Sequence, residues 1–231
     1  MFELCERIYD EFIGCGIGVH IPNGNSVGMW PEECKRLIWA ELNSPKLPSV
    51  VIGSHNGASE VLIGLTKVAK GDNSEIISVY LNFADFYELN IKRLKSRCNN
   101  DIRKLQINSS ELDKHLISEI GFALIDGYHS FQQVITDTEV LLPNLTAGSI
   151  LAYHDCGPKF PKRGIEGYPT QSGEDFYIDE AINKLLENKP LKEIDLKYGM
   201  ECFHPIETGL NSWVRGTTSP FNSLFLLSYV G

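Results

Sequence analysis

Short apolar runs alternate with amphipathic stretches along the central part of the chain. Each run is rich in Val, Ile or Leu and ends after a few residues, which is typical of strands buried in a parallel sheet. The runs are residues 50–52, 76–81, 102–107, 122–125 and 150–153. Because the stretches between them have helical spacing, the pattern predicts an α/β fold with a mostly parallel sheet.

The spacing of apolar residues predicts a helix after nearly every strand. The predicted helices are residues 60–69, 85–97 and 110–117, a helix opened by Ser130, and residues 177–186. Ser130 and Gln133 have the spacing of a capping box, and so do Asp85 and Glu88. Right-handed crossovers between the strands then give a Rossmann-like sandwich of three layers.

The N-terminal segment differs from this alternating series. Residues 2–13 and 31–42 are predicted helices, and two prolines, Pro45 and Pro48, end the segment. We interpret residues 1–48 as a helical cap or lid over the sheet. Together with the Rossmann-like core at 49–231 it forms a single predicted domain.

The C-terminal part contains a long loop and two further predicted strands. Residues 157–173 are rich in Pro and Gly, and a loop of this length is often functional. Residues 200–207 and 223–230 are predicted to pair as an antiparallel hairpin.

The chain has 231 residues and a formal net charge of −9. This acidic balance argues against nucleic acid or an anionic membrane surface as the main partner. None of the six cysteines forms a CxxC pair, so no zinc ribbon or redox motif is expected. Without a secretory pattern or a long apolar run, we expect a cytoplasmic protein with no membrane span. A homo-oligomer is left open.

Titratable side chains follow the last two strands of the central series. Asp126 and His129 come after the fourth strand, and His154 and Asp155 come after the fifth. Ligands of open α/β sheets bind beyond the carboxyl ends of the strands, so we expect the four side chains to converge. His129 is a candidate general base, and Asp126 and Asp155 are candidate ligands for Mg²⁺ or Mn²⁺. Since successive strand residues point to opposite sides, one of His154 and Asp155 is expected to pack instead.

A turn with two glycines, Gly53-Ser-His-Asn-Gly57-Ala-Ser59, follows the first strand. Glycines let the backbone approach a ligand closely, and the helix that follows offers free N–H groups. The pattern is GxxxGxS, which is neither the GxGxxG of dinucleotide binders nor a P-loop with its lysine. His55 is expected to line the pocket.

Four sequence blocks between the fourth strand and the end of the fifth form a recognisable pattern. They are Leu124-Ile-Asp-Gly-Tyr-His-Ser-Phe131, Asp137, Leu142-Pro-Asn-Leu-Thr-Ala-Gly148 and Tyr153-His-Asp155. Together they resemble class I S-adenosylmethionine (SAM)-dependent methyltransferases, in particular the branch of macrocin O-methyltransferase and related sugar O-methyltransferases. The resemblance covers roughly residues 49–155.

The resemblance implies a seven-stranded sheet with a reversed last strand, and SAM as the cofactor. The implied SAM contacts are Gly53, Ser54, His55, Gly57, Ser59, Asn82, Ser109, Ser110, Asp126 and Tyr128. It also implies catalytic roles for Asp126 and His129. In metal-using members, the residues that match Asp126, His154 and Asp155 bind Mg²⁺.

Two positions depart from the family pattern. Val51 stands two residues before the first loop glycine, where the family usually has an acid. Tyr80 closes the second strand, where an acid usually binds the ribose hydroxyls. The leading hypothesis is an O-methyltransferase that acts on a hydroxyl of a small polar acceptor such as a sugar. A metal-dependent hydrolase or lyase with the same cluster, and a non-catalytic binding module, are the alternatives.

Overall fold

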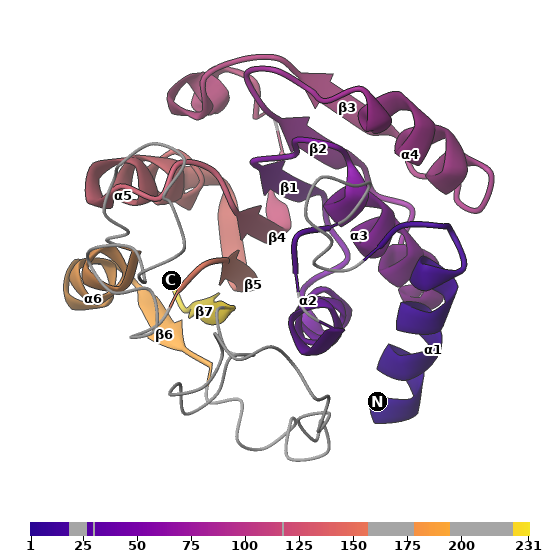
Figure 1. Cartoon of the computed structure of the whole chain (residues 1–231). Helices are drawn as coiled ribbons and strands as arrows, with labels where there is room; N and C mark the ends of the chain where they lie inside the picture. The colour runs from indigo at the N-terminus through magenta and orange to yellow at the C-terminus, as the bar shows by residue number, and fades with distance from the viewer. Residues whose placement is uncertain (19–26, 30, 117, 157–177, 195–223) are drawn as a thin grey trace, which may run out of the picture.

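The computed structural model describes residues 1–18, 27–29, 31–116, 118–156, 178–194 and 224–231, which include one seven-stranded sheet (Figure 1). The strands are β1 (Ser49–Ile52), β2 (Ile76–Val79), β3 (Ile102–Leu105), β4 (Ile120–Ile125), β5 (Leu145–Tyr153), β6 (Leu191–Glu193) and β7 (Phe225–Tyr229). Their order in the sheet is β3-β2-β1-β4-β5-β7-β6. β7 runs antiparallel to β5 and β6, and the other strand pairs are parallel, so the prediction of a mostly parallel sheet with a reversed C-terminal strand is confirmed.

The order of the strands creates a switch point at the centre of the sheet. The chain leaves β1 toward β2 and β3, and it then returns to place β4 on the other side of β1. The turns that follow β1 and β4 therefore diverge at the carboxyl edge of the sheet. Such a switch point is where open α/β sheets bind their ligands.

Helices cover both faces of the sheet (Figure 1). One face carries α1 (Phe2–Ile13), α2 (Pro31–Asn43), α3 (Ala58–Lys70) and α4 (Phe86–Lys95), and the other carries α5 (Phe131–Glu139) and α6 (Ile178–Asn188). Two 3₁₀ turns, η1 (Ser109–Lys114) and η2 (Leu142–Asn144), connect elements near α5. The arrangement is the Rossmann-like sandwich of three layers that the sequence predicts.

Alternate residues of each strand pack into separate cores on the two faces. Val51 of β1 belongs to the core beneath α3, whereas Val50 and Ile52 belong to the core beneath α5 and α6. The first core also contains Phe12 of α1 and Leu37 of α2, which are fully buried. The N-terminal helices are thus packed into the same hydrophobic core as the strands.

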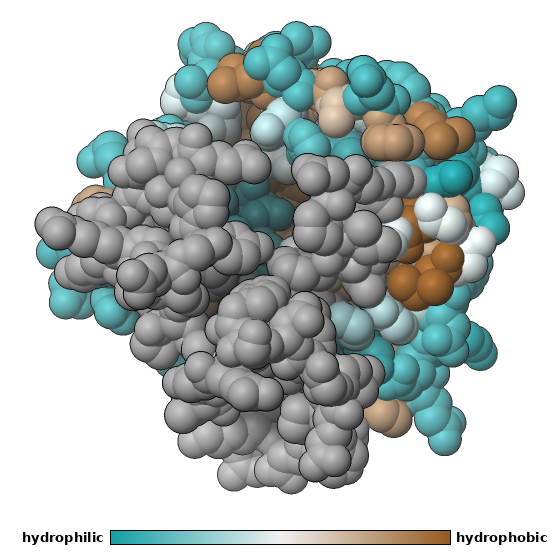
Figure 2. All heavy atoms as spheres, in the orientation of Figure 1, coloured by the Kyte–Doolittle hydropathy of each residue, from teal (hydrophilic) through white to brown (hydrophobic). Residues whose placement is uncertain are grey.

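One face of the molecule is seen in a space-filling view. On the face drawn in Figure 2, hydrophilic residues predominate and hydrophobic residues form small separate patches. None of the helices described is both long and apolar enough to cross a membrane.

The helix starts differ in part from the sequence prediction. Ser130 caps α5 as expected, with its hydroxyl accepting a hydrogen bond from the backbone N–H of Gln133 at 3.3 Å. The predicted cap of α4 is wrong, because the Asp85 side chain makes no capping hydrogen bond. Instead, Glu88 pairs with Lys104 of the neighbouring segment at 2.6 Å. The stretch predicted as a helix at 110–117 is the 3₁₀ turn η1, which Asn108 caps.

The C-terminal strands also differ from the prediction. The partner of β7 on its outer side is β6, a strand of three residues that the sequence pattern does not reveal. Residues 200–207, the predicted partner, lie outside the described residues, and so does the loop at 157–173.

A buried ion-pair network lies at the amino edge of the sheet. The Nζ of Lys67 lies 2.8 Å from Oδ2 of Asp72 and 3.5 Å from Oε1 of Glu41, and these three side chains are almost completely buried. Lys70 also pairs with Glu41, and the hydroxyl of Ser49 donates a hydrogen bond to the Glu41 carboxylate. The network joins α2, α3 and the start of β1.

A second buried acid, Glu60, lies in the first turn of α3. Its side chain is fully buried, and neither carboxyl oxygen has a hydrogen-bond partner among the described residues. Burial raises the pKa of Glu60 to about 7, although the nearby hydroxyls of Ser54 and Ser78 partly offset this effect. The carboxyl therefore favours its neutral form inside the protein.

Replacing Lys67 by Met should reduce the free energy of unfolding by about 3–5 kcal/mol, because the substitution leaves the buried carboxylate of Asp72 without its cation. Urea denaturation measures the change. Lys184→Met is the matched control, since Lys184 pairs with Glu187 on the exposed surface and its loss should cost less than about 1 kcal/mol. Equal losses in the two variants would contradict the role of Lys67.

Glu60 should make the stability of the protein fall as the pH rises from 4.5 to about 7. In this window the folded protein keeps a proton that the unfolded chain has lost, so increasing pH favours unfolding. Urea denaturation at pH 5 and pH 8 should show that Glu60→Gln removes about 3 kcal/mol of this dependence. Glu111→Gln, at an exposed position, should show the same pH dependence of stability as the wild type. If Glu60→Gln shows it too, Glu60 is not the group responsible.

Candidate active site

Two of the predicted site residues are positioned by the ends of neighbouring strands. The backbone N–H of Asp126 donates to the carbonyl of Ile52 at 2.9 Å, and that of His154 donates to the carbonyl of Ile125 at 3.1 Å. These hydrogen bonds continue the parallel ladder one residue beyond β1, β4 and β5. Asp126 and His154 are thereby fixed at the switch point.

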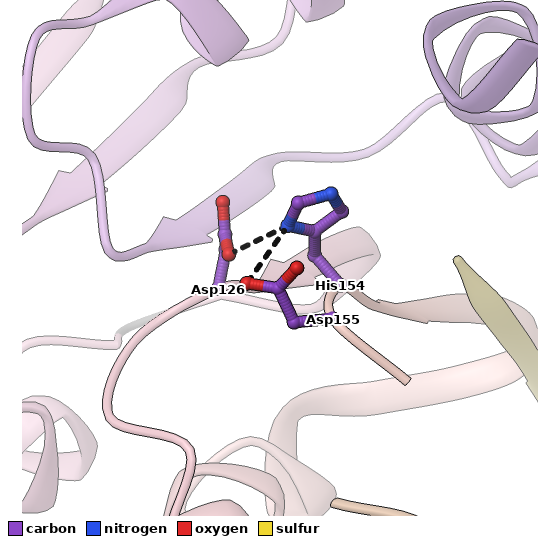
Figure 3. Close-up of side chains that lie close together, drawn as sticks. All are labelled: Asp126, His154 and Asp155. Carbon is purple, nitrogen blue, oxygen red and sulfur yellow. Dashed lines mark hydrogen bonds and ion pairs between the residues drawn. The ribbon is translucent and has the colours of Figure 1, made fainter. Parts of the chain in front are cut away.

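Asp126, His154 and Asp155 form one cluster, as the sequence predicts (Figure 3). The Nδ1 atom of His154 lies 3.0 Å from Oδ1 of Asp126 and 3.6 Å from Oδ2 of Asp155. The expectation that His154 or Asp155 would point away is wrong. Asp155 has a φ of 57°, and this left-handed turn interrupts the alternation of the strand, so that both side chains reach the same place.

Glu33, which the sequence analysis did not single out, completes the cluster from the N-terminal segment. Its Oε2 lies 3.4 Å from Nε2 of His154, on the side of the ring opposite to Asp126. The Glu33 side chain is 1% exposed and belongs to the first turn of α2, where the helix dipole stabilises a carboxylate. In the sequence, the only signal is the acidic pair Glu32-Glu33 at a helix start, which is common on surfaces.

The charges in the cluster depend on one another. Burial disfavours a charged imidazole, but Asp155, Asp126 and Glu33 outweigh this effect and raise the pKa of His154 well above its usual value. Burial would also raise the pKa of Asp126, but His154 and His129 hold it well below the usual range. Burial and the neighbouring carboxylates raise the pKa of Asp155. Positive charge at the centre of the cluster thus balances the acids.

His129 lies at the edge of the cluster, before the start of α5. Its Nε2 is 3.4 Å from Oδ2 of Asp155 and 3.9 Å from Oδ1 of Asp126. The side chain is 27% exposed, compared with 7% for His154. A partly exposed imidazole beside two carboxylates can take up a proton from a bound molecule, because the carboxylates stabilise the resulting cation.

The turn between β1 and α3 lies directly against the turn that carries Asp126. Gly53 has a φ of 98°, and a Cβ at this position would overlap the backbone carbonyl of Asp126. Gly57 has a φ of 76° at the start of α3. The two glycines are therefore required by the backbone itself, and this requirement does not depend on a ligand.

The serines of this turn are less accessible than the sequence suggests. Ser54 is buried, and its hydroxyl donates to the carbonyl of Val51 at 3.1 Å. Ser59 is 9% exposed, within the first turn of α3. His55 is exposed, and its ring lies edge-on to that of Tyr80 with the centroids 5.7 Å apart.

The other predicted cofactor contacts lie on the turns after β2, β3 and β4. Asn82, Ser110 and Tyr128 are exposed, whereas Ser109 is half-buried. The hydroxyl of Ser109 accepts a hydrogen bond from the side-chain amide of Gln133 at 3.0 Å, which ties η1 to α5.

The cluster has the composition of a metal site. One ligand atom each from Asp126, His154 and Asp155 lies within 4.8 Å of the others. Two carboxylates and one imidazole fit a divalent cation such as Mn²⁺, because the nitrogen ligand favours transition metals over Mg²⁺. The residues present therefore fit a metal ion.

Comparison with known proteins gives this site a context. Residues 50–156 match the family model described as a methyltransferase domain. This part of the chain includes the glycine turn, Asp126, His129 and the cluster at the end of β5. No curated protein matches the chain by sequence.

Several solved structures share the fold of the whole chain. The O-methyltransferase TomG from Streptomyces achromogenes, in complex with SAM, has a TM-score of 0.57 at 10% identity and aligns over 99% of this chain and 90% of its own. An O-methyltransferase from Bacillus cereus, in complex with S-adenosylhomocysteine (SAH), has a TM-score of 0.55 at 14% identity and aligns over 99% of this chain and 91% of its own. The TDP-rhamnose 3′-O-methyltransferase of calicheamicin biosynthesis has a TM-score of 0.51 at 14% identity, covering 98% and 93%. The sequence match over residues 50–156 is thus to a methyltransferase domain, and the chain shares the fold of these O-methyltransferases.

Proposed function

We propose that the protein transfers a methyl group from SAM to a hydroxyl of a small polar acceptor, such as a sugar. The observation that carries the proposal is the position of His129, a partly exposed imidazole beside Asp155 and Asp126. Asp126 in turn lies against the glycine turn after β1. A base at this place adjoins the switch point where ligands of α/β sheets bind. The structural neighbours that act on small molecules, among them the TDP-rhamnose enzyme, support this choice.

The proposed SAM site lies along the turns after β1, β2, β3 and β4. Gly53, Ser54, His55, Gly57 and Ser59 line its methionine and ribose side. Asn82, Ser109, Ser110 and Tyr128 surround the adenosine, and Asp126 lies between donor and acceptor. Support comes from the N-terminal end of α3, where the helix dipole favours an anionic group such as the SAM carboxylate.

The protein contributes mainly alignment and proton removal. The sulfonium of bound SAM supplies a methyl group on a good leaving group. Holding the acceptor oxygen in line with that methyl group removes much of the entropic barrier. His129 takes the hydroxyl proton as the oxygen attacks, and the carboxylate of Asp155 stabilises the imidazolium that forms.

A divalent cation is a proposed second cofactor, held by Asp126, His154 and Asp155. When bound, such an ion lowers the pKa of a coordinated hydroxyl and orients it. The donor set favours Mn²⁺ over Mg²⁺.

Three broader features remain proposals as well. We place residues 1–48 in the same domain as residues 49–231, because α1 and α2 share a core with the strands. A reducing, cytoplasmic location is supported by five buried free cysteines among the described residues. The net charge of −9 favours a small molecule over nucleic acid as the acceptor. Assembly into a homo-oligomer is compatible with the proposal.

Calorimetric titration of SAM and SAH into the wild-type protein and Tyr80→Asp tests the donor site. We expect micromolar binding to the wild type. We expect binding at least about tenfold tighter to Tyr80→Asp, because a carboxylate accepts hydrogen bonds from the ribose hydroxyls more strongly than a phenol does. Leu81→Asp, with a new charge at the exposed next position, is the control. Absence of binding at millimolar donor would favour a non-catalytic protein that keeps the fold.

His129→Ala should lower the turnover number by about 10²–10⁴-fold, since it removes the general base. Donor affinity should remain within about twofold of the wild type, because His129 lies on the acceptor side of Asp126. Steady-state kinetics with an accepted hydroxyl substrate, together with SAH calorimetry, separates the two effects. His115→Ala, away from the cluster, should leave both quantities unchanged, and normal turnover of His129→Ala would exclude the base.

A further inference from the structure

Three carboxylates surround the single buried ring of His154. Asp126 and Asp155 face Nδ1 at 3.0 and 3.6 Å, and Glu33 faces Nε2 at 3.4 Å. Without a metal ion the charged ring can donate from both nitrogens, to Asp126 and to Glu33, because carboxylates only accept hydrogen bonds. A divalent cation between Asp126 and Asp155 would replace the proton on Nδ1, and the Glu33 carboxylate then keeps the remaining proton on Nε2.

We propose that Glu33 is a positioning residue, which fixes the tautomer of His154 so that Nδ1 joins Asp126 and Asp155 in binding a divalent cation. The inference rests on the proposed function in one respect, the presence of that cation. Ligating histidines generally donate their second ring N–H to a carboxylate, which sets the ring orientation and strengthens binding. Here that carboxylate comes from α2, outside residues 50–156, which match the methyltransferase domain.

The attachment of α2 to the sheet has supports other than Glu33. The same helix is held at its other end by Glu41, which pairs with Lys67 and Lys70 and accepts from Ser49. Apolar residues such as Leu37 and Ile38 are fully buried between the two acids. Burying a carboxylate at position 33 costs desolvation free energy, so this residue destabilises the docking of α2 unless a partner compensates it. The partner is His154, which indicates that Glu33 serves the site.

The test measures Mn²⁺ affinity by electron paramagnetic resonance of the free ion, without SAM, in the wild type, Glu33→Leu and Glu33→Gln. We expect binding about 10–100-fold weaker in Glu33→Leu, and a smaller loss in Glu33→Gln, whose amide oxygen still accepts from Nε2. Glu41→Gln is the matched control on the same helix. It should lower the urea midpoint but leave Mn²⁺ affinity unchanged.

Each outcome bears on a defined statement. Unchanged Mn²⁺ affinity in both Glu33 variants overturns the role of Glu33 and leaves the metal site intact. Equal losses in Glu33→Gln and Glu41→Gln also overturn it, since the effect would then reflect the docking of α2. If Glu33→Leu does not fold, the comparison of these two Gln variants decides. A wild type that binds no Mn²⁺ overturns the inference, while SAM titration judges the methyltransferase proposal separately.

Discussion

Burial of the His154 imidazole among acids is the constraint on which the site depends. A charged or polar ring that is 7% exposed is stable only if every neighbour compensates it. The chain meets this condition with side chains from three places, namely α2, the end of β4 and the end of β5. Small shifts of any of these elements would leave an unpaired charge, so the electrostatics fix the edge of the sheet more strictly than apolar packing alone.

The helix α2 connects this edge to the opposite end of the sheet. Glu33 and Glu41 are eight positions apart, so a rise of about 1.5 Å per residue separates them by roughly 12 Å along the helix. One acid contacts His154, and the other pairs with Lys67 and Lys70. A helix attached by charge at both ends has little freedom to slide, which helps to keep the site preorganised.

The sequence predicts much of this architecture because strand ends are visible in it. Buried strands read as apolar runs, and the residues that follow them, Asp126 and His154, meet at one edge for topological reasons. The part played by Glu33 could not be predicted, since an acid in a first helical turn looks the same whether it faces water or a buried ring. The orientation of Asp155 was missed for a local reason, a positive φ that propensities do not reveal.

The contact between Gly53 and the carbonyl of Asp126 has a mechanical consequence. Two backbones that touch without an intervening side chain cannot move independently. Any ligand that displaces the turn after β1 therefore displaces the turn after β4 as well. A displacement of one turn is in this way transmitted directly to the other.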